Sequence, residues 1–110
     1  MSEERAEKLS AAVQRDVNEI LLREFSFKPG VFITISRVDT SVDLRYTYLS
    51  LSIFPEKETQ YVLKSLEKEI YKIQGLLNKK LRMRPLPKIV FKLDTSEIEA
   101  EKIEKLLKET

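Results

Sequence analysis

The chain has 110 residues, of which 42% are hydrophobic and 35% are charged, and its formal net charge is only +2. This length suits a single domain with one modest core, so we expect residues 1–110 to fold as one domain. The chain contains neither Cys nor His, which excludes disulfides and thiol chemistry and removes the commonest general base and metal ligand. An enzyme would need an unusual constellation of carboxylate, Lys, Arg, Tyr, Ser or Thr side chains. We identify no such set in the sequence, and so expect neither an enzyme nor a bound metal or cofactor.

Apolar runs in the chain are only a few residues long, too short to cross a membrane. The first residues, Met-Ser-Glu-Glu-Arg-Ala, lack the apolar stretch of a signal peptide. The sequence thus predicts a cytoplasmic protein without a membrane partner.

The first half of the chain predicts a helix followed by a β-hairpin. Apolar residues recur at steps of three and four between residues 4 and 25, which is typical of an amphipathic helix. Pro29-Gly30 then interrupts the helical pattern. β-Branched residues dominate 31–38, apolar and polar residues alternate within 44–54, and the turn-forming segment 39–43 joins these two predicted strands.

The second half predicts a helix, a strand and a last helix. Apolar residues keep a helical period over about 58–82, after which Pro85 and Pro87 end the helix. Alternating apolar and polar residues predict a third strand around 88–93. Ser96 and Glu99 have the spacing of a capping box, so a helix is expected from there to about residue 108. Its predicted apolar side consists of Ile98, Ile103, Leu106 and Leu107.

Together these elements predict an α+β fold, a single two-layer domain in which helices cover one face of a three-stranded sheet, with an additional C-terminal helix. No internal repeat, low-complexity tract or linker interrupts the sequence. We therefore expect one compact unit.

Positive charge is concentrated in one part of the sequence. Residues 58–92 contain nine basic and three acidic side chains. Residues 1–25 contain four basic and six acidic side chains, and residues 93–110 contain three basic and six acidic ones. Such asymmetry favours a polyanionic partner.

On a helical projection, the basic residues of the 58–82 segment share one side, opposite the apolar residues. This side consists of Lys64, Lys68, Lys72, Gly75, Lys79 and Arg82. Every amphipathic helix has a solvated face, which is the plainer interpretation. A merely solvated face normally mixes both signs of charge to form i,i+4 pairs, however, and this side lacks acidic residues beyond Glu69. We therefore favour a phosphate-binding stripe.

Gly75 has two alternative roles in this interpretation. Without a side chain it would permit a sugar-phosphate backbone to approach the helix closely, or allow the helix to kink. Alternatively, it is a packing point against a neighbouring element. The sequence leaves these roles open.

The order helix–strand–strand–helix–(helix)–strand–helix resembles a K-homology RNA-binding domain of the bacterial arrangement, type II. The local sequence resembles the ribosome-binding factor A family more specifically, over about residues 5–107. The segments that carry this resemblance are Ile20-Leu21-Leu22-Arg23-Glu24, Thr34-Ile35-Ser36-Arg37-Val38, Ser41-Val42-Asp43-Leu44, Leu81-Arg82-Met83-Arg84, Pro87-Lys88-Ile89-Val90-Phe91 and Asp94-Thr95-Ser96.

The resemblance implies that the chain binds the small ribosomal subunit and helps its ribosomal RNA to mature, without a small-molecule substrate. We expect it to act as a monomer. The resemblance also implies a helix kink near the RNA. Aligned without gaps, the kink motif of the family falls on Glu69-Ile70-Tyr71 and its following Arg falls on Gln74, so the kink is placed either there or at Gly75.

These arguments predict an RNA-binding surface that begins on the helical stripe and continues through the third strand. Its predicted residues are Lys72, Gly75, Lys79, Lys80, Arg82, Arg84, Lys88 and Lys92. The dipole of a helix C-terminus would explain one of the two arginines, but not seven basic residues. The alternative is a protein–protein interaction module that uses the same scaffold to bind an acidic partner.

Two further groups have structural explanations. Tyr46 and Tyr48 lie on one face of the second strand and could stack bases. Such pairs more often cover a sheet face, and K-homology domains do not read RNA from that face, so we place them outside the site. The carboxylates of Asp39, Asp43 and Asp94 suit Mg²⁺, yet all three stand where turn or cap residues belong, and we expect no metal site.

Overall fold

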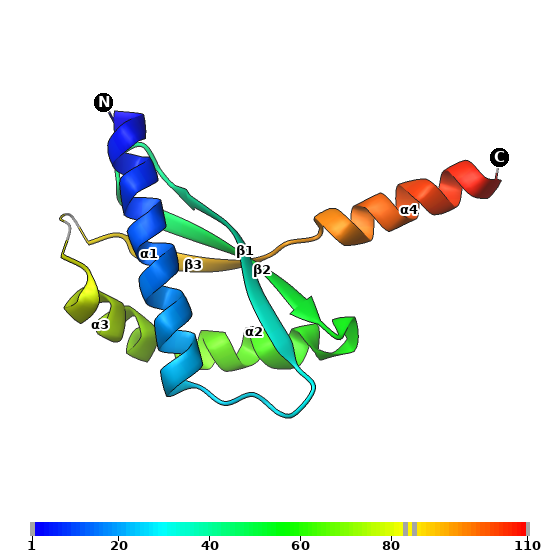
Figure 1. Cartoon of the computed structure of the whole chain (residues 1–110), viewed down its shortest axis with the longest axis horizontal. Helices are drawn as coiled ribbons and strands as arrows, with labels where there is room; N and C mark the ends of the chain where they lie inside the picture. The colour runs from blue at the N-terminus through cyan, green and yellow to red at the C-terminus, as the bar shows by residue number, and fades with distance from the viewer. Residues whose placement is uncertain (1, 83, 85, 110) are drawn as a thin grey trace.

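The computed structural model describes residues 2–82, 84 and 86–109. A long helix is followed by a hairpin, two consecutive helices, a third strand and a final helix (Figure 1). The elements are α1 (Ser2–Glu24), β1 (Phe32–Thr40), β2 (Tyr46–Phe54), the short 3-10 helix η1 (Glu56–Glu58), α2 (Thr59–Lys68), α3 (Ile70–Lys80), β3 (Lys88–Leu93) and α4 (Ser96–Glu109). In this part of the chain, no helix is long and apolar enough to cross a membrane.

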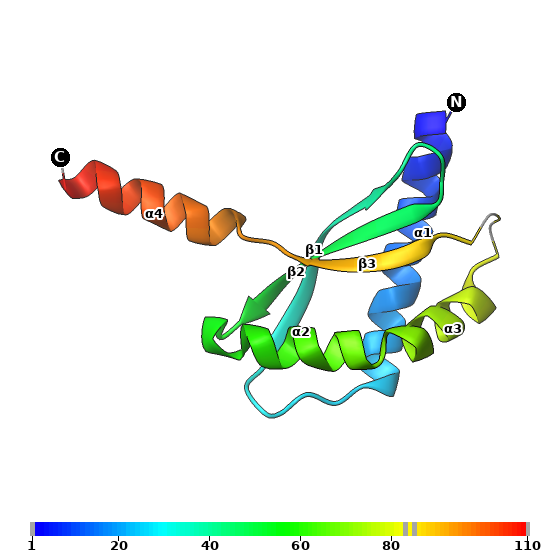
Figure 2. The same ribbon diagram turned by 180° about the vertical axis from the view of Figure 1, so that it is seen from behind.

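The three strands form one sheet in the order β1-β2-β3, as the predicted fold class requires. β1 and β2 pair antiparallel, and β3 joins β2 in parallel after the chain crosses over through α2 and α3 (Figure 2). An irregularity in the register between Ile35 and Arg37 leaves Ser36 without a partner on β2, which is a β-bulge. The predicted α+β architecture is therefore confirmed.

The turn of the hairpin explains why β2 begins later than predicted. Leu44 has a φ of 62°, in the left-handed region that side chains with a Cβ seldom adopt, so β2 begins only at Tyr46. Asp43 Oδ1 accepts hydrogen bonds from Ser41 Oγ at 2.7 Å and from the backbone N–H of Arg45 at 3.1 Å. The turn roles predicted for Ser41 and Asp43 are confirmed.

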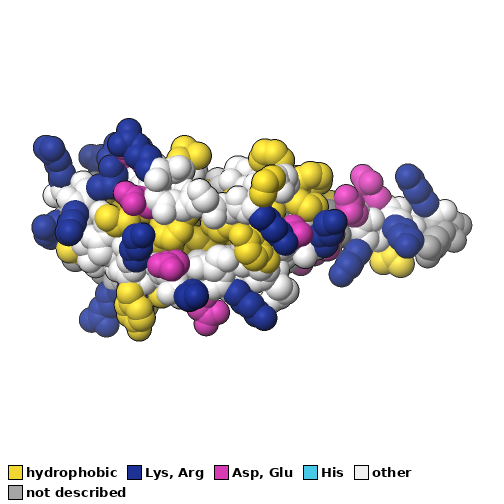
Figure 3. Space-filling view, turned by 90° about the horizontal axis from the view of Figure 1, so that it is seen from below, with side chains coloured by type: hydrophobic (Ala, Val, Ile, Leu, Met, Phe, Trp, Pro, Cys, Tyr) yellow, Lys and Arg dark blue, Asp and Glu magenta, His cyan; other side chains and the backbone are white. Residues whose placement is uncertain are grey.

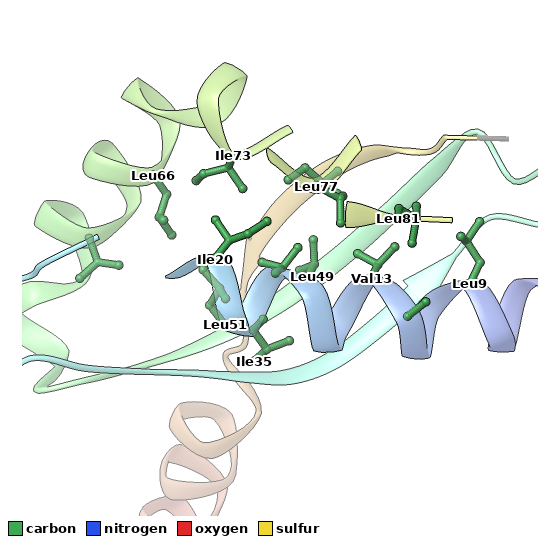
Figure 4. Packing of buried hydrophobic residues seen from close by; sticks show 14 residues of the cluster. Leu9, Val13, Ile20, Ile35, Leu49, Leu51, Leu66, Ile73, Leu77 and Leu81 are labelled. Carbon is green, nitrogen blue, oxygen red and sulfur yellow. The ribbon is translucent and has the colours of Figure 1, made fainter. Parts of the chain in front are cut away.

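The helices α1, α2 and α3 pack on one face of the sheet, and the core lies between them (Figure 4). Alternation along each strand decides which side chains enter it, because successive residues point to opposite faces. The core consists of Leu9, Ala12, Val13, Val17, Ile20, Ile35, Leu49, Leu51, Val62, Leu66, Ile73, Leu77, Leu81 and Ile89. None of the described helices covers the other face of the sheet (Figures 1 and 2).

The last helix, α4, extends away from the rest of the molecule (Figure 1). Of its predicted apolar side, Ile103, Leu106 and Leu107 are 58%, 63% and 69% exposed, and the side chain of Ile98 lies outside the described residues. The helix begins at Ser96 as predicted, and the Thr95 carbonyl accepts its first helical hydrogen bond from the Glu99 N–H at 2.9 Å. The side chain that accepts from a backbone N–H of the first turn is Asp94, whose Oδ1 lies 2.9 Å from the Ser96 N. The pattern predicted the helix correctly without predicting where it lies.

Candidate nucleic-acid interface

The helical segment predicted over 58–82 is divided into α2 and α3 at Glu69. This residue has φ −103° and ψ 12°, and its N–H is shared between the carbonyls of Ser65 and Leu66 at 3.2 Å each. α2 contacts β2 while α3 contacts α1, and one straight helix could not follow both. Of the two positions left open for the kink, the structure therefore selects the segment 69–71. α3 ends at Lys80; Met83 and Pro85, which belong to the predicted segment beyond it, lie outside the described residues.

Gly75 lies inside α3, and its position is exposed. A Cβ built there would meet no atom within 4 Å, so no neighbouring element packs against it. The kink and the packing point considered for Gly75 are both wrong. Because Gly75 follows Lys72 by three residues and precedes Lys79 by four, it leaves bare backbone on the side of the helix that carries these two lysines.

Exposed basic side chains follow α2, α3 and the start of the next segment. We call this the helix surface, and it consists of Lys64, Lys68, Lys72, Lys79 and Arg82. Within the described residues, none of the five has a carboxylate within ion-pair distance. Figure 3 shows that basic side chains gather at the end of the molecule opposite α4. Such a surface attracts phosphates.

Lys72 Nζ lies 5.5 Å from the centre of the Phe25 ring, and two further predicted basic residues form hydrogen bonds within the protein. Lys80 Nζ lies 3.0 Å from Glu19 Oε2 and so joins α3 to α1. The hydrogen bond from Lys80 lowers the pKa of Glu19 below its usual value. Arg84 Nη1 donates to the carbonyl of Leu81 at 3.2 Å, just beyond the C-terminus of α3, where a cation is favourable. Both residues therefore contribute to the fold, and their charges are less available to a partner.

Lys92 lies on a different face from the helix surface, and Lys88 lies at the edge of the sheet. β3 directs Ile89 and Phe91 toward the helices, so alternation directs Lys88 and Lys92 toward the open face. Lys92 therefore does not extend the helical stripe, whereas Lys88, at the start of β3, also lines a hollow with Tyr71 and Gln74 of α3. The alternation from which we predicted the strand already implied the position of Lys92.

Gln74, which sequence analysis placed in no site, joins α3 to the start of β3. Its Nε2 donates to the carbonyl of Pro87 and to Asn78 Oδ1, both at 3.0 Å, and its Oε1 accepts from the N–H of Ile89 at 2.9 Å. The amide thus satisfies two backbone groups at once. No local signal distinguishes such a Gln from any other polar residue on an amphipathic helix, because its partners are 13 and 15 residues away.

A groove of about 480 Å³ runs beside this amide, between α3 and the segment that enters β3. Its lining includes the apolar residues Ile70, Leu86 and Ile89, together with Tyr71 and Lys88. Tyr71 belongs to the kink segment and is 89% exposed. The groove therefore places an aromatic ring and a cation next to the break between α2 and α3.

The three carboxylates considered as a metal site are engaged separately. Asp39 Oδ2 lies 2.7 Å from Arg37 Nε, Asp43 accepts from Ser41, and Asp94 accepts from Ser36 Oγ at 2.5 Å. The Ser41 hydroxyl lowers the pKa of Asp43, and the Ser36 hydroxyl, followed by Ser96, lowers that of Asp94 to about 2. Among the residues whose positions are known, no group of three potential ligands could hold a metal ion.

An α+β domain with the K-homology element order, a broken helix and a row of cations along it has the features of a small nucleic-acid-binding module. A family model described as Ribosome-binding factor A matches residues 5–107. The chain belongs to this family.

Relatives of known name support the same conclusion. The chain is similar to ribosome-binding factor A of Natranaerobius thermophilus, with 41% identity over 99% of this chain and 84% of that protein. It is 37% identical to ribosome-binding factor A of Dictyoglomus thermophilum, over 96% of this chain and 90% of the relative. Its fold is similar to a homology model of the Thermus thermophilus factor, fitted into a cryo-EM map of a 30S complex, with a TM-score of 0.66 and 25% identity over 80% of this chain and 93% of the other.

Proposed function

We propose that this protein binds the small ribosomal subunit and assists the maturation of its ribosomal RNA, acting in the cytoplasm as a monomer. Membership of the ribosome-binding factor A family supports this function, as does the Thermus thermophilus relative fitted into a map of a 30S complex. In this proposal the protein catalyses no reaction and needs no cofactor or small-molecule substrate. It acts by binding RNA.

The observation that carries the proposal is the helix surface. Its cations lack carboxylate partners among the described residues, while Gln74 and Lys80 hold the underlying α3 against β3 and α1. A rigid row of cations loses little conformational entropy when it pairs with phosphates. Ribosomal RNA is recognised largely by shape and by single-stranded segments, so phosphate contacts on a fixed framework suit this partner.

The first experiment is sedimentation of a tagged copy of the protein through a gradient of cell lysate, at low and at high salt. We expect the protein to travel with free small subunits, to be absent from translating ribosomes and to dissociate at high salt, because phosphate contacts release counterions. If it stays at the top of the gradient in both salts, it does not bind the subunit. Release by nuclease treatment distinguishes an RNA partner from an acidic protein partner.

The helix surface is tested with the variant K72A/K79A/R82A and purified small subunits over a salt series. Removing three phosphate contacts should reduce the slope of log K against log salt by about 2. The matched control is K102A/K105A/K108A, which removes three cations from α4, and its slope should equal that of the unchanged protein. An equal reduction in both variants would mean that net charge, and not this surface, determines binding.

A further inference from the structure

The open face of the sheet carries two tyrosines whose rings lie together. The ring centres of Tyr46 and Tyr48 are 6.3 Å apart, and their planes are inclined by only 24°. Tyr46 is 40% exposed, and none of the described helices lies over this face (Figure 2). We predicted that the pair merely covers the sheet. Tyr46 is exposed and Tyr48 is half-buried, however, so the exposed parts of the two rings are available to a partner.

Two lysines of β3 stand beside these rings. Lys92 Nζ lies 4.4 Å from the centre of the Tyr48 ring, and Lys88 is the register partner of Tyr46. Neither lysine pairs with a carboxylate in the described part of the chain. The nearby arginines of the hairpin, by contrast, pair with acids: Arg37 with Asp39, and Arg45 with Asp43. The uncompensated positive charge therefore lies next to the tyrosines.

The other end of the sheet provides an internal comparison. Phe32 and Phe54 are register partners on the same face, and both are more exposed than Tyr46. The pocket beside Phe54 is lined by three acids, Glu56, Asp94 and Glu101. A partner recognised only through apolar contact would suit either aromatic pair. A polyanion suits only the tyrosine end.

We propose that Tyr46, Tyr48, Lys88 and Lys92, which we call the sheet surface, bind a second, single-stranded segment of RNA. Unpaired bases stack on the tyrosine rings, and the lysines pair with the adjoining phosphates. Aromatic rings beside cations are the common means of holding single-stranded nucleic acid, because every base has a face that can stack. The inference rests on the proposed function, which supplies RNA as the partner.

The position of the sheet surface extends that function. Its tyrosines and Lys92 lie on the face of the sheet opposite α2 and α3, so one RNA segment lying flat against the helix surface does not cover them. Lys88 lies at the edge of the sheet and also lines the groove beside α3. Lys88 and Lys92 are separated by about 13 Å along β3, enough to reach more than one phosphate. A protein with RNA sites on both faces of its sheet joins two segments of the same RNA, which is a direct way to hold an unfinished structure together.

The test is the affinity of the purified protein for a fluorescently labelled oligouridylate of about 12 nucleotides, measured by anisotropy. The variant Y46L/Y48L keeps apolar side chains but loses the rings, and it should bind at least about tenfold more weakly. The matched control F32L/F54L removes the other aromatic pair and should change the affinity less than twofold. Equal losses in the two variants, or affinity of Y46L/Y48L within twofold of the unchanged protein, would overturn the proposal.

The salt dependence separates the two kinds of contact. Y46L/Y48L removes no charge, so its slope of log K against log salt should be unchanged. K88Q/K92Q should lower that slope by about 1.4, because two phosphate contacts to a single strand are lost. An unchanged slope in K88Q/K92Q would exclude the lysines from the site.

Two measurements do not depend on the leucine variant folding. Y46F/Y48F retains both rings and should bind within twofold of the unchanged protein; a large loss would mean that the hydroxyls and not the rings bind. The unchanged protein should also bind oligouridylate about tenfold more tightly than a base-free strand with the same phosphates, and equal affinity would overturn stacking. If the sheet surface does not bind oligouridylate, the protein can still sediment with small subunits, and the proposed function stands. If the protein does not sediment with small subunits, the proposed function itself is contradicted.

Discussion

α3 and α4 are both amphipathic helices with an apolar side and a polar side. The apolar side of α3 is packed in the protein core, whereas that of α4 is exposed to solvent. In α3, Ile73 and Leu77 are fully buried against the core, and Gln74 and Lys80 join the helix to β3 and α1. In α4, Leu106 and Leu107 are largely exposed, and the helix is attached through the residues around Asp94. An amphipathic pattern specifies a helix with an apolar side, but it does not specify the surface that this side contacts.

The largest expected effect comes from shortening one buried leucine of α3. Leu77→Ala should lower the free energy of unfolding by about 2–5 kcal/mol, because it removes buried methyl groups and leaves a cavity. Leu106→Ala, the same change on α4, should cost less than about 0.5 kcal/mol. Denaturant unfolding measures both. A cost above about 1 kcal/mol for Leu106→Ala would mean that α4 packs against the domain in solution.

A smaller effect is expected at the contact between α3 and β3. Gln74→Ala removes the hydrogen-bond partner of the Ile89 N–H and of the Pro87 carbonyl, which should cost about 1–3 kcal/mol. Gln60→Ala, at an exposed position of α2, is the matched control and should change stability by less than about 0.5 kcal/mol. Thermal unfolding of both variants decides the point. Equal effects would show that the Gln74 contacts contribute nothing.

Gly75 allows a test in which stability and binding change in opposite directions. Gly75→Ala should stabilise the protein by about 1 kcal/mol, since a helix interior prefers Ala and no atom lies near the new Cβ. If RNA approaches the bare backbone there, the same variant should bind small subunits more weakly.

In α4, Ala100→Gly should reduce helical circular dichroism and leave the main unfolding transition in place. A shift of that transition would mean that α4 contributes to the stability of the rest of the domain.

The smallest effect is confined to acidic pH and concerns the junction from which α4 departs. Hydrogen bonds from Ser36 and Ser96 lower the pKa of Asp94 from 3.8 to about 2. Because the folded state holds the ionised form, the contribution of Asp94 is fully present above about pH 4 and is lost as the pH falls toward 2. The difference in melting temperature between the unchanged protein and Asp94→Asn should therefore shrink as the pH falls and be smallest below about pH 2. Ser36→Ala should weaken this dependence, and a difference that stays constant from about pH 5 to pH 2 would refute it.

Sequence analysis predicted the types of element well and their ends less well. Periodicity reports local geometry, so spacing at three and four residues predicted α1, and alternation predicted β3. The ends of elements were predicted incorrectly where the backbone conformation of a single residue determines the boundary. Leu44 adopts a positive φ and delays the start of β2, and Glu69 interrupts a helix that its neighbours would continue.

The basic residues of the candidate site were predicted from the sequence, but their positions relative to one another in the folded protein were not. Lys72 and Lys79 lie where the helical projection placed them, whereas Lys80 pairs with Glu19 of α1. Lys92 belongs to the opposite face, and the alternation of its own strand already contained that information. The structural role of Gln74 was missed, because it depends on the backbone of a distant segment.

The sequence by itself determined the fold class, the family, the turn of the hairpin and the concentration of positive charge between residues 58 and 92. These properties depend on residue types and on spacings between near neighbours, which the order of amino acids states directly. The tertiary structure alone decided the position of the kink, the exposure of α4, the engagement of Lys80 and the gathering of Lys92 with Tyr48. Each of these depends on how segments far apart in the chain pack against one another, and local periodicity carries no information about that choice.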